Sequence, residues 1–108
     1  MHQKALEIHE RIGDEPGVAW AYGNLADAYQ EMGDVGQALT YYHKALEIKE
    51  RISDWIGAAD NYFNLGRLYR DQGELERARA QFEKAKVLYE MVGASRGAQR
   101  AARALRGV

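Results

Sequence analysis

The chain has 108 residues, of which 46% are hydrophobic and 29% charged, with a net charge of −1, one proline and no cysteine. This length suits one packed domain, and the lack of cysteine excludes disulfides, thiolate metal sites and a cysteine nucleophile. No apolar run reaches the roughly 20 residues of a membrane-spanning helix, the N-terminus lacks a signal-peptide pattern, and near-neutrality argues against a uniformly basic nucleic-acid binder. We therefore expect a cytoplasmic protein of one domain.

The sequence repeats itself at an offset of 40 residues. The segment 4–12 (KALEIHERI) returns at 44–52 (KALEIKERI) with eight of nine residues identical, and a degraded copy occupies 84–92. Further pairs keep the same offset, namely Asp14/Asp54, Gly17/Gly57, Ala19/Ala59, Tyr22/Tyr62, Asn24/Asn64, Leu25/Leu65, Tyr29/Tyr69, Gly33/Gly73 and Ala38/Ala78. The offset predicts a single domain over 1–108 whose parts are a half-repeat at 1–13, full repeats at 14–53 and 54–93, and a capping helix at 94–108.

Within each period the apolar residues have helical spacing. The i, i+3, i+4, i+7 pattern of one helix face is followed by Tyr22, Leu25, Ala26 and Tyr29. In chain order, this spacing predicts about six helices, near 2–12, 14–33, 35–52, 55–72, 75–92 and 95–106. Since no stretch alternates as a strand does, the sequence predicts an all-α solenoid of antiparallel helical hairpins.

The predicted helices also carry end signals. Asp14 is placed to cap the first full-length helix, and Gly33 to end it in the left-handed conformation that glycine adopts without strain. Asp34, with Gln37 three residues later, predicts a capping box for the following helix. Ser95 is expected to open the last helix.

The order of large and small residues resembles the tetratricopeptide repeat signature. It is carried by Tyr22–Leu25–Ala26–Tyr29–Gly33–Ala38–Tyr42–Ala45 and, more closely, by Tyr62–Leu65–Gly66–Tyr69–Gly73–Ala78–Phe82–Ala85. The 40-residue period is similar to that of Pins/LGN-type scaffolds and of many bacterial and archaeal signalling proteins. The resemblance implies a right-handed superhelical solenoid in which the first helix of each hairpin lines a concave groove that holds a peptide.

Catalytic and metal-binding motifs find little support. There is no glycine-rich phosphate loop and no serine nucleophile motif, and Ser53 and Ser95 lie at helix starts or turns, where capping explains them. His2 and His9 share one helix face, a spacing that a metal ion could use, but we favour the interpretation that both are solvated surface residues. For His43 we favour a packing or surface role. We therefore expect no enzyme, no metal and no cofactor.

A second stripe runs along the first helix of each hairpin, beside the apolar face. It consists of Trp20, Asn24, Asp27 and Glu31 in one repeat and of Asp60, Asn64, Arg67 and Asp71 in the next. Arg100, flanked by Arg96 and Arg103, continues it in the last helix. The resemblance implies that this stripe faces the ligand, with peptide-binding residues Trp20, Asn24, Asp27, Phe63, Asn64, Arg67, Arg70, Arg100 and Arg103.

These residue types suit a peptide ligand. Amides such as Asn24 and Asn64 both donate to and accept from a peptide backbone, and arginines hold carboxylates. Trp20 and Phe63 are of the types that dominate interface energies. Other interpretations stay open. The asparagines could bond within the array and Trp20 could pack on the preceding helix, while the arginines could form a solvated face or pair with Asp27, Asp60 and Asp71.

The charge distribution adds a competing hypothesis. Residues 1–54 carry 5 basic and 10 acidic side chains, and residues 55–108 carry 10 basic and 6 acidic ones, eight of the basic residues being arginines. Our first hypothesis is a protein-interaction scaffold that binds a peptide segment, one with acidic residues. The alternative is end-to-end self-assembly through the exposed terminal helices, while nucleic acid is disfavoured because the acidic half repels phosphate.

Overall fold

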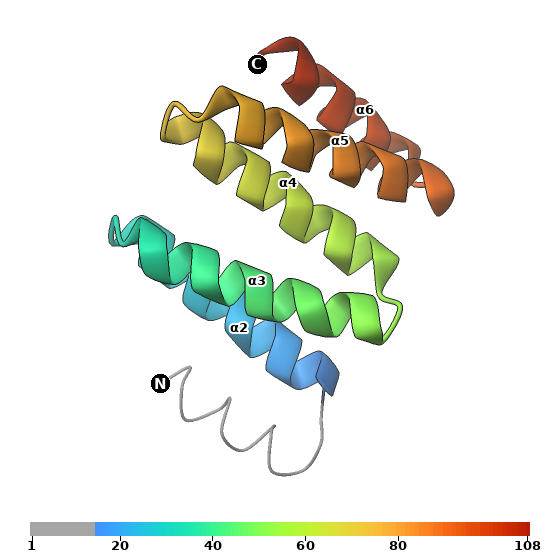
Figure 1. Cartoon of the computed structure of the whole chain (residues 1–108). Coiled ribbons are helices and arrows are strands. Elements are labelled where there is room, and N and C mark those ends of the chain that lie inside the picture. Colours follow the sequence, from blue (N-terminus) through green and yellow to red (C-terminus); the bar gives the residue numbers. More distant parts are fainter. Residues whose placement is uncertain (1–14) are drawn as a thin grey trace. The chain divides into compact units, whose positions relative to one another are not determined.

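The structure, a computed structural model, describes residues 15–108, which are helical apart from short turns and contain no strand within that range (Figure 1). Its helices are α2 (Glu15–Glu31), α3 (Val35–Arg51), α4 (Trp55–Asp71), α5 (Leu75–Met91) and α6 (Ser95–Arg106). These five match five of the six predicted helices, and the all-α prediction is confirmed. The helix expected over 2–12, and Asp14 as a cap, lie outside the described residues.

The chain divides into two compact units, Met1–Ser53 and Asp54–Val108. In the first, α2 packs against α3, and in the second α4 packs against α5 and α5 against α6 (Figure 1). The division falls where the sequence predicts that one repeat ends and the next begins. The predicted right-handed superhelix concerns the arrangement of these units and stays a prediction.

Each of the helices α2 to α5 is followed by a residue with a left-handed backbone. These are Gly33, Ser53, Gly73 and Gly93, with φ of 82°, 62°, 79° and 73°. At Gly33 the turn has the hydrogen bonds of a Schellman motif, because Gly33 N–H donates to the Gln30 carbonyl at 3.0 Å and Asp34 N–H to the Tyr29 carbonyl at 2.9 Å. The predicted role of Gly33 is thus confirmed.

The helix starts agree only partly with prediction. Asp34 accepts a hydrogen bond from Gln37 N–H at 3.2 Å, which is one half of the predicted capping box, but the Asp34 N–H donates to the Tyr29 carbonyl and not to the Gln37 side chain. Asp54 likewise accepts a hydrogen bond from Gly57 N–H at 3.0 Å. Ser53 lies at a turn and Ser95 opens α6, both as predicted, but neither residue occupies the cap position. Ser53 is the left-handed residue before Asp54, and Ser95 is the first residue of α6, behind Ala94, which makes no side-chain cap. Sequence position alone does not separate a cap from its neighbours.

Small residues let the paired helices approach closely. Ala26, Ala38, Ala45, Ala78 and Ala85 are fully buried. A Cβ placed on Gly66 of α4 would lie 2.7 Å from the ring of Phe82 on α5, closer than real Cβ atoms come to any neighbour. The large side chains then fill the hairpin cores, where Tyr42 is 2% and Phe82 0% exposed.

Two glycines of the first hairpin predict opposite responses to the same substitution. Among residues 15–108, neither Gly23, inside α2, nor Gly33 has a neighbouring atom within 4 Å of an added Cβ, so we expect backbone conformation to decide the outcome. Gly23→Ala should raise the free energy of unfolding by about 0.5–1 kcal/mol, because alanine favours a helix interior. Gly33→Ala should lower it by about 1 kcal/mol, because alanine is strained at positive φ. Urea denaturation followed by circular dichroism measures both, and shifts of equal sign would contradict the backbone argument.

Candidate functional site

The predicted stripe on α2 contains one strongly exposed aromatic residue. Trp20 is 64% exposed. The alternative that it packs on the preceding helix concerns residues 2–12, which lie outside the described residues. Asn24, one turn later, is half-buried, and its side chain makes no hydrogen bond within residues 15–108. Asp27 is exposed but engaged in its own hairpin, since the Tyr42 hydroxyl donates to its carboxylate at 2.6 Å and to the Gln30 side-chain oxygen at 2.8 Å.

The stripe on α4 repeats part of this pattern. Asn64, at the position equivalent to Asn24, is again half-buried and has no side-chain hydrogen bond in the described part of the chain. Arg67 is exposed and, among the described residues, has no carboxylate within ion-pair distance. Arg70 lies 3.7 Å from Asp71, and its guanidinium is 5.9 Å from the centre of the Phe82 ring.

Phe63, expected to be an exposed anchor, lies in the core of the second unit. It is 8% exposed, and its ring centre lies 5.3 Å from that of Phe82. The guanidinium of Arg100, from α6, covers the ring at 4.4 Å. What this part of the surface presents to solvent is therefore the arginine and not the aromatic ring.

Arg100 belongs to a polar cluster built from three helices of the second unit. The Tyr89 hydroxyl of α5 donates to the carboxylate of Asp60 on α4, and Arg100 donates to the Tyr89 oxygen at 3.1 Å. Arg100 and Asp60 themselves are 3.7 Å apart. The sequence-based alternative in which arginines pair with acidic residues of the stripe is thus observed for Arg100 and Asp60.

The cluster perturbs one titration. Burial, together with the hydrogen bond to Asp60 and the negative charge of that carboxylate, raises the pKa of Tyr89 to about 12. Tyr89 is 2% exposed and therefore needs a polar partner for its hydroxyl inside the fold.

Sequence analysis missed Tyr89. Its equivalent in the preceding repeat is Lys49, and the equivalent of Asp60 is Trp20. Both members of the Tyr89–Asp60 pair therefore differ between the repeats, and a search for paired differences at the 40-residue offset could have found them.

The exposed face of α6 carries the remaining predicted arginine. Arg96, Arg100 and Arg103 follow one another at intervals of four and three residues, and all three are exposed. We call these three residues the α6 basic face. The opposite side of the helix packs into the core through Ala101, which is fully buried, with Ala98 and Leu105 beside it.

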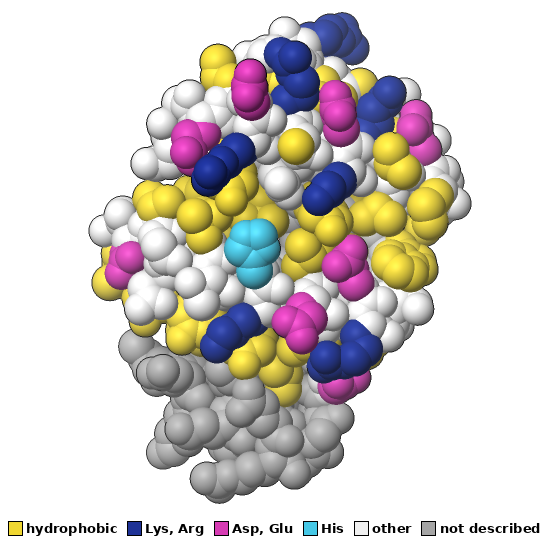
Figure 2. Space-filling view, in the orientation of Figure 1, with side chains coloured by type: hydrophobic (Ala, Val, Ile, Leu, Met, Phe, Trp, Pro, Cys, Tyr) yellow, Lys and Arg dark blue, Asp and Glu magenta, His cyan; other side chains and the backbone are white. Residues whose placement is uncertain are grey.

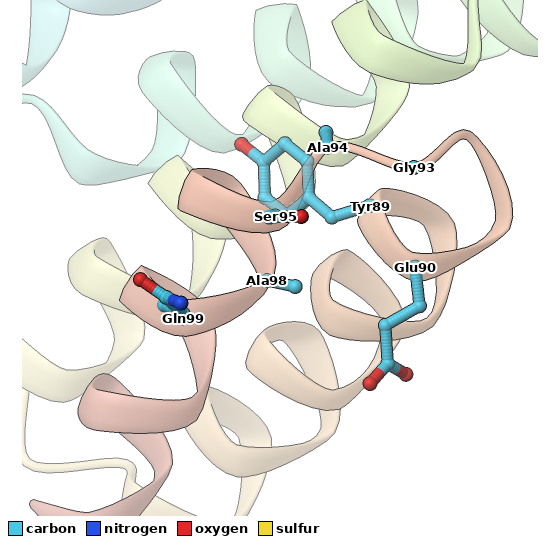
Figure 3. A pocket seen from close by; sticks show the side chains of 7 residues that line it. All are labelled: Tyr89, Glu90, Gly93, Ala94, Ser95, Ala98 and Gln99. Atoms are coloured by element: carbon cyan, nitrogen blue, oxygen red, sulfur yellow. The ribbon is translucent and has the colours of Figure 1, made fainter.

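An open pocket of about 340 Å³ lies at the turn between α5 and α6 (Figure 3). It is lined by Tyr89, Glu90, Gly93, Ala94, Ser95, Ala98 and Gln99. None of the predicted peptide-binding residues is among them, so the pocket lies beside the stripe and not on it.

Within 15–108 no group of three or more His, Asp or Glu side chains is placed to hold a metal ion, and His2 and His9 lie outside that range. No helix among these residues is long and apolar enough to cross a membrane. On the face that Figure 2 shows, basic and acidic side chains are interspersed with hydrophobic ones.

Comparison with known proteins identifies the repeat. A family model described as tetratricopeptide repeat matches residues 1–51 and 18–91. No curated protein matches the chain. Among solved structures, the chain is similar to BtubC (BKLC) from P. vanneervenii, with 25% sequence identity and a TM-score of 0.71. The similarity covers 97% of this chain but 53% of that one, so the chain spans about half the length of its solved relative.

The Tyr89 cluster predicts a loss of stability at high pH. Because the pKa of Tyr89 is raised from 10.0 to about 12 in the folded state, the folded protein holds this proton more tightly than the unfolded chain does. The stability that the folded state gains from this tighter proton binding is complete below pH 10 and is lost as the pH rises through 12. Between these values Tyr89→Phe should lose less stability than the unsubstituted protein, as measured by urea denaturation at each pH. Parallel curves for the two proteins would show that Tyr89 titrates normally.

Proposed function

The chain belongs to the tetratricopeptide repeat family, and we propose that it is a non-catalytic scaffold that binds a peptide segment of a partner protein along α2 and α4. Repeats of this family generally mediate binding between proteins and typically have no catalytic role. Each hairpin offers the stripe of its own first helix, α2 in the first unit and α4 in the second, as a surface for the peptide.

The observation that carries the proposal is the pair of unpartnered amides. Asn24 and Asn64 occupy equivalent positions, both are half-buried, and neither side chain has a hydrogen bond within residues 15–108. A polar group withdrawn from water without a partner costs about 1–3 kcal/mol. A peptide backbone would supply the missing donor and acceptor to each amide.

Two neighbouring side chains add to this surface. Trp20, 64% exposed, precedes Asn24 by one turn and offers a large apolar contact. Arg67, exposed and without an ion-pair partner among the described residues, follows Asn64 by three residues and offers a cation. Asp27 and Arg70, which contact residues of their own units, contribute charge to the rim of the proposed site.

A peptide selected on the protein tests the proposal. A displayed library of random 12-residue peptides is selected on the folded chain, and the best binder is labelled and titrated by fluorescence anisotropy. Asn64→Ala and Trp20→Ala should each weaken binding by about tenfold, since each removes a central contact. Gln37→Ala is the matched control, because it removes an exposed amide from α3, outside the stripe.

Two results would contradict this function. One is a library that yields no binder with a dissociation constant below about 100 μM, the weak end of specific peptide recognition. The other is a selected peptide whose affinity falls no further in Asn64→Ala and Trp20→Ala than in Gln37→Ala. Circular dichroism of each variant checks that the helices are intact.

A further inference from the structure

The Arg100 side chain makes contacts on two sides. Its guanidinium lies 4.4 Å from the centre of the Phe63 ring, and one of its nitrogens donates to the Tyr89 hydroxyl at 3.1 Å. Phe63 and Tyr89 are themselves buried, at 8% and 2% exposure. An arginine that already contacts buried neighbours loses little conformational freedom when it binds an anion, so it is preorganised for anion binding.

The carboxylate already beside Arg100 satisfies it only in part. The distance to Asp60 is 3.7 Å, whereas a direct arginine–carboxylate pair closes to about 2.7–2.9 Å and commonly forms two parallel bonds. Asp60 instead accepts the hydrogen bond of the Tyr89 hydroxyl. The side chains of Arg100 and Asp60 are 55% and 50% exposed, so solvent and ligands reach both.

The rest of the α6 basic face has no such internal carboxylate. Arg96 and Arg103, one turn before and after Arg100, are exposed and have no ion pair within residues 15–108. The helix α6 carries four arginines and no acidic residue. This row of cations is complementary in charge to a segment with several carboxylates, and we expect it to bind such a segment more tightly than one with few carboxylates.

We propose that the α6 basic face binds the carboxylates of an acidic segment of a partner protein, and that Asp60 is an internal carboxylate that competes with that segment for Arg100. The inference rests on the proposed function, since it names the charge class of the partner that the scaffold binds. It adds a second contact region, in which a residue of the protein itself opposes binding.

An acidic protein segment fits this face better than a nucleic acid does. The helix α6 presents no aromatic side chain on which a base could stack, and Phe63 is covered by Arg100.

A defined acidic peptide tests the proposal on the full chain. The probe is a fluorescein-labelled ten-residue peptide of alternating Glu and Ser, and the same peptide with Gln in place of Glu is the neutral control. The acidic probe should bind more tightly than the neutral one, with an affinity that falls as salt is raised. Arg100→Gln should weaken binding by about tenfold, whereas Asp60→Asn, which keeps an acceptor for Tyr89, should strengthen it by about threefold or more.

Two controls separate competition from a general effect of charge. Arg77→Gln removes the same charge from α5, away from the α6 basic face, and should change the affinity by less than about twofold. In a protein that already carries Arg100→Gln, the further change Asp60→Asn should lose most of its effect, because the two residues act through one contact.

Several outcomes would overturn the inference. They are no preference for the acidic probe, equal effects of Arg100→Gln and Arg77→Gln, an Asp60→Asn gain that persists without Arg100, or tighter binding of a labelled ten-nucleotide single strand than of the acidic probe. Thermal unfolding of each variant checks that the fold is retained. If the library-selected peptide still depends on Asn64 and Trp20 while these tests fail, the proposed function stands and this inference alone is lost.

Discussion

The left-handed residue that follows each of the helices α2 to α5 is the constraint on which the rest of the described structure depends. Gly33, Ser53, Gly73 and Gly93 follow one another at intervals of 20 residues, and each of the helices α2 to α5 that they follow has 17 residues. Because both helices of a hairpin have the same length, residues 40 positions apart occupy equivalent places in the two units. Asn24 and Asn64 recur at one place on the first helix for this reason, and so do the alanines that allow close packing.

The two repeats differ in their polar contacts, and where one member of a contact differs, its partners differ as well. In the first, buried Tyr42 donates to Asp27 and Gln30. In the second, the equivalent residue is Phe82, and the equivalent of Gln30 is Arg70, whose guanidinium lies 5.9 Å from the Phe82 ring. A hydroxyl left without its acceptor would cost about 1–3 kcal/mol, so the members of such a set change together. The Tyr89–Asp60 pair, which replaces Lys49 and Trp20, follows the same rule.

The sequence predicts what depends on local chemistry and misses what depends on neighbouring helices. The positions of five helices, the turn at Gly33 and the cap at Asp34 follow from spacing and from single-residue conformational preference. The burial of Phe63 does not, because Arg100 covers it from a helix two elements later, and helical periodicity carries no information on that contact. Residue type alone also does not identify the capping residue. Serine is a common N-cap, but the cap position before α6 is occupied by Ala94 and not by Ser95.

The weakness of the Arg100–Asp60 contact gives the proposed acidic site its selectivity. Exposed ion pairs contribute about 0.2–1 kcal/mol, so a single carboxylate from a ligand would replace Asp60 with almost no net gain. A segment that also reaches Arg96 and Arg103 adds contacts that Asp60 does not oppose, and its binding energy grows with each one. An internal competitor at one of three cations therefore raises the number of carboxylates that a partner needs, which discriminates between partners of different charge more sharply than three unopposed arginines would.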